Sequence, residues 1–242
     1  MNEFEKRNHE MVTAMSVDMD LQEKACSLFT AANKHEYSYH FRWLGRPIIQ
    51  YPQDIVAIQE LIWEVQPDLI IETGVAHGGS LILSASILEL IGRPASVLGI
   101  DIDIRAHNRV EIERHPMSKR IHLIQGSSIC EEVISKVRKH VTNAKRVLVF
   151  LDSNHEHEHV LKELELYSPL VSKGSYVVVF DTVIEDLPAG SFPDRPWDKG
   201  SNPMTAVFDF LKSTKRFVID KNLENKLLLT VAPNGYLRCV AD

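Results

Sequence analysis

The sequence predicts one α/β domain built around a mainly parallel sheet. Three observations lead to this fold class. Apolar runs recur along the chain with helical patterns between them, which is typical of βαβ units. Near-continuous Val, Ile and Leu in these runs indicates strands that are buried on both faces. A glycine-rich turn joins the first run to a helical pattern, and three of the five runs end in aspartate.

Two helices are expected before the sheet. Met19–Asn33 has an amphipathic pattern, and Asp54–Val65 has another that starts after Pro52. We interpret residues 1–66 as an N-terminal helical extension and residues 67–242 as the core of a single domain that covers 1–242. The length fits one large α/β domain, and no internal repeat or low-complexity tract divides the chain.

The core is expected to contain seven strands. Five of them should be parallel: Leu69–Glu72, Ser96–Asp101, Ile121–Ile124, Val147–Asp152 and Tyr176–Asp181. Helices should follow the first and fourth of these strands, at Ser80–Ile91 and Glu156–Tyr167. The last two strands, Phe217–Asp220 and Lys226–Val231, should form an antiparallel hairpin before a final turn at Pro233–Gly235. The proline-rich segment 183–203, which holds Phe192 and Trp197, is expected to be a lid loop.

Composition excludes several classes of protein. Hydrophobic residues make up 44% and charged residues 25%, as in ordinary globular proteins, and the net charge of −6 argues against nucleic-acid binding. No apolar run reaches the roughly 18 residues of a membrane span. The N-terminus lacks a signal-peptide core, and the three cysteines are far apart. We therefore expect a cytoplasmic protein without nucleic-acid or membrane partners.

The stretch Asp68–Ser80 is the most informative part of the chain. Glu72 ends the first strand, and Gly74, Gly78 and Gly79 follow in the pattern G-x-x-x-G-G. A strand, a glycine turn and a helix place free backbone N–H groups over a crevice that suits a nucleotide-like cofactor. The dinucleotide pattern G-x-G-x-x-G is absent, and a carboxylate at Glu72 favours a ligand with an ammonium group, such as S-adenosylmethionine. The glycines alone are equally compatible with any tight turn.

Acids at other strand ends extend this hypothesis. Asp101 lies 27 positions after Gly74, near the place where nucleotide-binding folds bind ribose hydroxyls. Asp152 and Asp181 end successive strands and could together bind Mg²⁺ or Mn²⁺. His155 should lie beside such a metal and could remove a proton from a hydroxyl.

Residues 155–159 also match the zinc-hydrolase pattern H-E-x-x-H, through His155, Glu156 and His159. That motif needs both histidines well inside one helix, whereas His155 follows a strand end by three residues. We keep zinc hydrolysis only as an alternative.

Several motifs resemble the cephalosporin hydroxylase (CmcI-like) family over roughly residues 37–240. They are Trp43–Gln50, Pro67–Ser80, Asp152-Ser-x-His155, Phe180-Asp-Thr182 and Asn202-Pro-x-Thr-Ala206. Members of this family look like class I S-adenosylmethionine-dependent methyltransferases with a Rossmann-like sheet. Related macrolide-sugar O-methyltransferases use a divalent metal with a D-x-x-H motif, which corresponds here to Asp152 and His155. Those relatives end the fifth strand in Glu-Asp, whereas this chain has Phe180-Asp181.

The resemblance implies methyl transfer from S-adenosylmethionine to a hydroxyl of a sugar or sugar-containing natural product, a small-molecule or glycan acceptor. His155 and Asp152 would be catalytic, and Asp152 with Asp181 would bind Mg²⁺ or Mn²⁺. Trp43, Arg46 and Trp197 would contact the acceptor, and a homo-oligomer is possible. The cofactor would contact Glu72, Gly74, His77, Gly78, Gly79, Ser80, Asp101, Gly126, Ser127 and Asp152.

Three other classes of function stay open. An NAD-dependent oxidoreductase would use the same fold, although the dinucleotide glycine pattern is missing. A 2-oxoglutarate hydroxylase would need two histidines and one carboxylate on a different scaffold. A non-catalytic binding protein would have the crevice without needing Asp152, His155 and Asp181 together.

Overall fold

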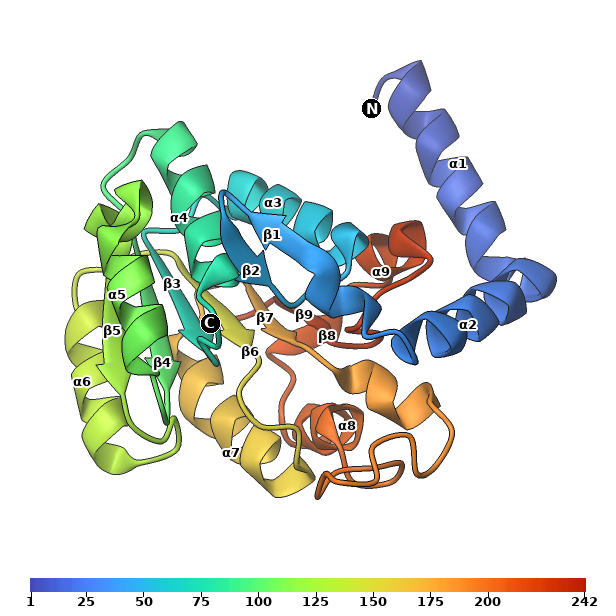
Figure 1. Cartoon of the computed structure of the whole chain (residues 1–242). Coiled ribbons are helices and arrows are strands. Elements are labelled where there is room, and N and C mark those ends of the chain that lie inside the picture. Colours follow the sequence, from blue (N-terminus) through green and yellow to red (C-terminus); the bar gives the residue numbers. More distant parts are fainter.

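The computed structural model describes residues 1–242, and its main sheet has seven strands. They are β3 (Leu69–Thr73), β4 (Ser96–Asp101), β5 (Ile121–Gln125), β6 (Val147–Leu151), β7 (Tyr176–Val179), β8 (Phe217–Ile219) and β9 (Tyr236–Cys239). Their order is β5-β4-β3-β6-β7-β9-β8 (Figure 1). The first five in this order are parallel, and β9 runs antiparallel to both neighbours. The predicted Rossmann-like fold is confirmed.

Nine α-helices surround the sheet. They are α1 (Glu3–Val17), α2 (Met19–Asn33), α3 (Pro52–Val65), α4 (Gly79–Ile91), α5 (Ala106–Arg114), α6 (Glu131–Val141), α7 (His157–Tyr167), α8 (Pro203–Ser213) and α9 (Lys221–Leu227). The helices predicted at 19–33, 54–65, 80–91 and 156–167 are confirmed to within two residues. None of the nine combines the length and apolar character that crossing a bilayer requires.

The core consists of two apolar layers, one on each face of the sheet. Successive strand residues point to opposite faces, so Ile70 joins the layer with α3 and α4, whereas Leu69 and Ile71 join the layer with α6, α7 and α8. Side chains from both faces of the central strands are fully buried. This double burial explains why the strands read as continuous apolar runs.

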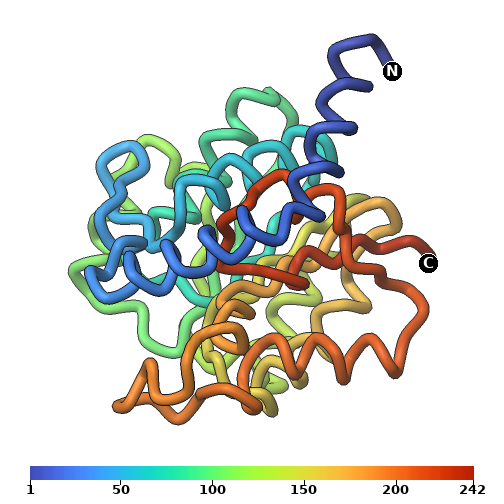
Figure 2. Tube along the Cα trace, turned by 90° about the vertical axis from the view of Figure 1, so that its right-hand side faces the viewer, coloured from blue at the N-terminus to red at the C-terminus, as the bar shows by residue number.

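The N-terminal extension contains strands as well as helices. A short antiparallel pair, β1 (Phe41–Trp43) and β2 (Arg46–Ile48), lies between α2 and α3 and was not predicted. Helix α1 has no buried residue, and it contacts α9 and α2 while its N-terminal end projects from the molecule (Figures 1 and 2). The hairpin, in contrast, packs against α4, since an added Cβ at Gly79 would lie 2.2 Å from the carbonyl oxygen of Pro47.

The predicted strand Lys226–Val231 is wrong. Its first two residues end helix α9, and the antiparallel partner of β8 is Tyr236–Cys239. Asp220 caps this helix by accepting hydrogen bonds from two backbone N–H groups, and Leu223 and Leu227 are buried one turn apart. This i, i+4 spacing within the apolar run is the helical signal. The turn at Pro233–Gly235 is present but leads into the last strand.

The topology places a switch point between two neighbouring strands. After β3, the next two strands, β4 and β5, lie on one side of it. The chain then crosses over, and β6 and β7 lie on the other side of β3. In open α/β sheets a ligand site lies outside the carboxyl ends of the strands at such a switch point. Here β3 and β6 pair in register, with Thr73 opposite Leu151. Gly74 and Asp152 therefore follow side by side.

Candidate functional site

The glycine loop after β3 packs directly against the end of β6. Gly74 has a φ of +91°, and a Cβ there would lie 1.9 Å from the carbonyl oxygen of Asp152. Only glycine combines this conformation with such a close approach. Gly78 has a φ of +81° and precedes α4 as its N-cap residue. The loop thus brings the N-terminus of α4 and the end of β6 to one place.

Two residues that the sequence reasoning did not connect hold this loop from outside. The Arg46 guanidinium donates to the carbonyl oxygen of His77 at 3.0 and 2.7 Å and to Asn108 Oδ1 at 3.0 Å. Asn108 is buried, and its Nδ2 donates to the carbonyl oxygen of Ala76 at 2.9 Å. Arg46 is thereby bound to the glycine loop, so its predicted contact with an acceptor stays a prediction. No local signal links Arg46 to a helix 60 residues away.

Asp101 also supports the loop. Its Oδ2 accepts hydrogen bonds from the backbone N–H groups of Val75 at 2.8 Å and Ala76 at 3.2 Å. Oδ1 accepts one from Asp103 at 3.0 Å. These bonds tie the end of β4 to the loop, and a carboxylate retains further lone pairs for ribose hydroxyls. The predicted ribose contact stays a prediction.

Glu72 is a buried acid without a cationic partner. Its side chain is 3% exposed, the hydroxyl of Ser80 donates to Oε1, and Oε2 has no hydrogen-bond partner. Burial raises the pKa of Glu72 to about 8, although the hydrogen bond from Ser80 opposes this shift. An uncompensated buried carboxylate is expensive, because desolvation penalises its charge. A bound cation would remove that penalty.

Asp152, His155 and Asp181 come together beside Glu72. One ligand atom from each of the three lies within 4.8 Å of the others. His155 Nε2 is 3.4 Å from Asp181 Oδ2, and Gln50 Nε2 donates to Asp152 Oδ2 at 3.2 Å. Burial, and then the neighbouring charges of Asp181 and Glu72, raise the pKa of Asp152 well above its usual value. Two oxygen donors and one nitrogen donor form a group that can hold a divalent cation.

The backbone at this group is unusual. Strand β7 ends at Val179, and Asp181 has a φ of +54°, in the left-handed region that non-glycine residues rarely adopt. The Phe180 side chain packs in the apolar layer instead, where its ring centroid lies 6.0 Å from that of Phe150. The residue at position 180 therefore points away from the metal-binding group, and Asp181 alone supplies a carboxylate from this strand end.

Aromatic residues from two distant segments lie around the group. Trp197, in the segment 183–203 that is orange in Figure 2, contacts the His155 ring edge-on at a centroid distance of 4.8 Å. The Arg195 guanidinium lies 5.2 Å from the centre of the Trp197 ring. Burial and the charge of Asp181 raise the pKa of Tyr39, which places this residue of the N-terminal segment near the same acids. Trp43 lies elsewhere, since its indole N–H donates to Ser86 on α4.

The proline-rich segment is tied at its base. It begins with a short 3₁₀ helix (Thr182–Asp186), and Glu185 accepts hydrogen bonds from Asn202 Nδ2 at 2.6 Å and Gly200 N at 2.8 Å. Both ends of the segment are therefore fixed while its middle is exposed. Its role as a lid stays a prediction.

The two histidines of the H-E-x-x-H pattern have different partners. His155 precedes α7 and contacts Asp181, whereas His159 lies inside α7 beside Ser128, Ser153 and the buried Glu163. They do not share a helix face, so this geometry offers no zinc-hydrolase site. The Ser128 contact instead joins the end of β6 to the loop after β5. In that loop Gly126 has a φ of +148°, and Ser127 follows it.

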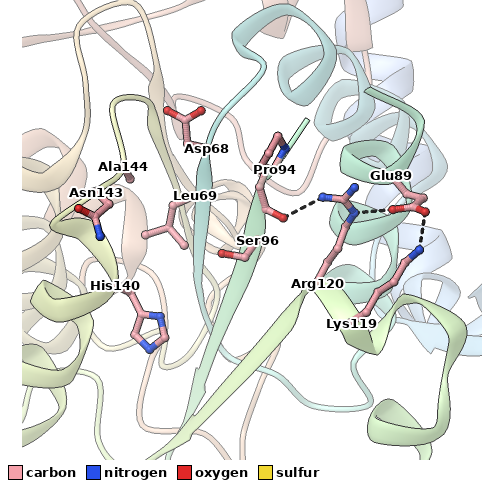
Figure 3. Close-up of a pocket in the computed structure, with 11 residues that line it drawn as sticks. Asp68, Leu69, Glu89, Pro94, Ser96, Lys119, Arg120, His140, Asn143 and Ala144 are labelled. Carbon is pink, nitrogen blue, oxygen red and sulfur yellow. Dashed lines mark hydrogen bonds and ion pairs between the residues drawn. The ribbon is translucent and has the colours of Figure 1, made fainter. Parts of the chain in front are cut away.

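A sizeable cavity lies at the opposite edge of the sheet. It has a volume of about 600 Å³ and opens at the amino ends of β3 and β4 (Figure 3). Its charged residues are already paired. Glu89 accepts from Lys119 at 2.5 Å and Arg120 at 2.6 Å, and Asp68 accepts two backbone N–H groups at 3.0 Å. No predicted site residue lines this cavity.

The chain resembles known proteins in sequence and in fold. The sequence model described as Rhamnosyl O-methyltransferase/CmcI matches residues 35–240. A rhamnosyl O-methyltransferase of Mycobacterium tuberculosis is 31% identical over 189 residues, which cover 76% of this chain and 72% of that protein. One of Mycobacterium leprae is 28% identical over 197 residues, which cover 81% of each.

Two solved structures share the fold. A structure of CmcI with Mg and SAM has a TM-score of 0.60 at 20% identity and covers 84% of this chain and 78% of that chain. An O-methyltransferase from Bacillus cereus in complex with SAH has a TM-score of 0.54 at 15% identity and covers 84% of each.

Proposed function

The chain belongs to the rhamnosyl O-methyltransferase/CmcI family and is an O-methyltransferase, and from this premise we propose its cofactor, acceptor and metal. We propose that it transfers the methyl group of S-adenosylmethionine to a hydroxyl of a sugar or sugar-containing natural product, with the help of a divalent cation. The observation that carries this proposal is the convergence of Asp152, His155 and Asp181 beside the glycine loop.

The chemistry of the crevice supports the cofactor. S-adenosylmethionine carries an ammonium and a sulfonium group, and both are cationic. Glu72 offers a buried oxygen without a partner, and the pKa of Asp152 is raised by burial and by the neighbouring charges of Asp181 and Glu72. A cationic ligand would stabilise the ionised form of both carboxylates. The pyrophosphate of NAD would instead bring negative charge to these acids, so the oxidoreductase alternative is disfavoured.

The donor set fits Mg²⁺ or Mn²⁺. Asp152 and Asp181 supply the carboxylate oxygens that hard cations prefer, and water or acceptor oxygens would complete the coordination. A cation bound there would polarise the acceptor hydroxyl and lower its pKa. Phe180 stands where relatives resembling this chain carry a second acid, so the protein contributes fewer oxygens and should bind the metal loosely.

His155 is proposed to take the proton. It lies at the same strand ends as both aspartates, and Asp181, at 3.4 Å from Nε2, can stabilise the imidazolium that forms. Trp197 packs edge-on against this ring and restricts its orientation. The residues of the crevice hold the methyl donor and the hydroxyl oxygen in line, and this positioning supplies most of the rate acceleration in such a transfer.

The acceptor is proposed to lie between Trp197 and Tyr39. Aromatic faces suit the apolar faces of sugar rings, and both residues are at least partly exposed. The exposed Arg195 guanidinium, stacked over Trp197, is the free cation near this opening, since Arg46 is bound to the glycine loop. The three cysteines are unpaired, which supports our proposal of a reducing, cytoplasmic location.

Calorimetric titration with S-adenosylmethionine, S-adenosylhomocysteine and NAD tests the cofactor. Binding of the first two without NAD is expected, and binding of NAD alone would contradict the proposal. Methylation assays with a panel of sugars should then lose activity in EDTA and regain it with Mg²⁺ or Mn²⁺. Full activity in EDTA would contradict the role of the metal but not the proposed methyl transfer.

A further inference from the structure

Gln50 has an environment that the residues discussed above do not explain. Its side chain is 3% exposed, yet the amide oxygen Oε1 has no hydrogen-bond partner. The other end of the amide is occupied, because Nε2 donates to Asp152 Oδ2 at 3.2 Å. Glu72 Oε2 and Thr73 Oγ1, at the end of β3, are also buried without partners. Several orphaned acceptors thus lie around one edge of the switch point.

The segment that carries Gln50 reaches this point by crossing the glycine loop. Arg46 binds the carbonyl oxygen of His77, and the Pro47 carbonyl packs on Gly79. The chain then places Gln50 against Asp152, 102 residues away in sequence. The contacts on both sides fix the direction of this short segment. The position of the Gln50 amide is therefore built by the fold and is not a chance orientation of a surface side chain.

The orphaned oxygen calls for a hydrogen-bond donor from a ligand. A buried acceptor without a partner costs about 1–3 kcal/mol, so a donor from water or from a ligand normally satisfies it, and beside Asp152 a ligand can supply one. The carboxylates of Glu72 and Asp152 are acceptors when ionised and cannot then satisfy it. An ammonium group has three N–H donors and a charge that suits the neighbouring carboxylates.

The strand order indicates which part of the cofactor lies here. Asp101 and Gly126 follow β4 and β5, on one side of β3, so ribose and adenine belong on that side. Asp152 follows β6, on the other side of β3, together with Gln50. We propose that Gln50 binds the amino-acid part of S-adenosylmethionine, with Oε1 accepting a hydrogen bond from the ammonium group while Nε2 holds Asp152 in position. This inference rests on the cofactor of the proposed function.

The test compares two ligands that differ only in that part. S-adenosylhomocysteine carries the amino-acid group, and 5′-methylthioadenosine retains the adenosine and sulfur without it. Gln50→Met keeps the length of the side chain and removes its polar atoms. We expect Gln50→Met to weaken S-adenosylhomocysteine binding about 10- to 100-fold, as for a hydrogen bond to a charged group. Calorimetric affinity for 5′-methylthioadenosine should stay unchanged.

Gln53→Leu is the matched control. Gln53 is three residues further on, in the first turn of α3, and its Oε1 is also buried without a partner. Its removal should leave both affinities unchanged. Gln50→Leu serves as a second variant in case Gln50→Met does not fold.

The possible outcomes separate the two proposals. Equal weakening of both ligands by Gln50→Met, or no weakening of either, would overturn the role of Gln50. Failure of both Gln50 variants to fold would also overturn it, since Gln50 would then be a residue that builds the fold. A wild-type protein that binds neither ligand would instead contradict the proposed cofactor.

Discussion

The two edges of the sheet differ in how their charges are compensated. At the amino edge, Glu89 accepts hydrogen bonds from Lys119 and Arg120, and these lower its pKa. At the carboxyl edge, Glu72 is buried and Asp152 is half-buried, both without a cation, and desolvation raises their pKa values. The amino edge has a cavity of about 600 Å³. Its charges nevertheless need no further partner.

This contrast is the reason why we place the proposed site by unpaired charge and not by open volume. A cavity lined by matched ion pairs has little to gain from a ligand. A buried acid without a partner has a free-energy penalty that a cationic ligand can relieve. Perturbed pKa values tend to cluster at functional sites for the same reason. The predictions below compare a residue at the carboxyl edge with a counterpart at the amino edge.

The largest effect is expected from His155→Ala. Loss of a general base typically lowers a rate by about 10²–10⁴-fold, so turnover should fall in that range. Affinity for S-adenosylhomocysteine should stay nearly the same, because His155 faces the acceptor. The control is His140→Ala, which changes an exposed histidine lining the cavity at the amino edge and should leave turnover unchanged. If His155→Ala keeps the wild-type turnover, His155 is not the general base.

The stability of the protein without ligand should depend on pH. The pKa of Glu72 is raised from 4.5 to about 8, so the folded state favours the protonated acid. The stability from this group is complete below pH 4.5 and is lost as pH rises towards 8. Each pKa unit is worth about 1.4 kcal/mol, so the loss can reach a few kcal/mol.

Thermal melts between pH 5 and 8 would measure this effect, and Glu72→Gln should flatten the decline above pH 6. Asp54, whose pKa burial raises to about 6, contributes to the decline at lower pH in both proteins. If the melting temperatures of the two proteins fall equally with pH above pH 6, Glu72 does not titrate there.

The next largest effect is expected on cofactor affinity in Glu72→Gln. Glu72→Gln removes the charge near the proposed ammonium and should weaken S-adenosylhomocysteine binding by about 1–3 kcal/mol. Asp68→Asn is the counterpart, because Asp68 precedes the same strand at its other end and binds only backbone N–H groups. It should leave the affinity unchanged. Equal affinities of wild type and Glu72→Gln in calorimetry would contradict the assignment of Glu72.

The carboxyl edge could be predicted from the sequence because its residues follow strands. Glu72, Asp101 and Asp152 were placed by the ends of apolar runs, and the parallel arrangement then brought them to one edge. Gln50, Arg46 and Asn108 were not connected to the glycine loop in this way. Their contacts join residues that are 31 to 102 positions apart in sequence. The pattern of apolar runs does not predict where these three residues lie relative to the sheet.

The end of the sheet shows a different limit of sequence reasoning. The run Lys226–Val231 is apolar enough for a strand, but Asp220 caps a helix before it and Leu223 pairs with Leu227 at helical spacing. Thr230 and Val231 then donate to the buried carboxylate of Asp54 on α3. This tertiary contact draws the segment away from the sheet, and a short apolar run alone cannot reveal it.

The smallest effect is expected from Glu89→Gln at the amino edge. This change removes the carboxylate partner of Lys119 and Arg120, but Lys119 is exposed to water and Arg120 keeps its hydrogen bonds to the carbonyl oxygens of Arg93 and Ala95. Exposed ion pairs contribute little to stability and are screened by salt. The melting temperature should therefore fall slightly at low salt, and the difference from wild type should shrink at high salt. Turnover and S-adenosylhomocysteine affinity should match the wild type, because the switch point lies at the other edge of the sheet. A marked loss of cofactor binding in Glu89→Gln would move the site to the amino edge, beside the cavity there.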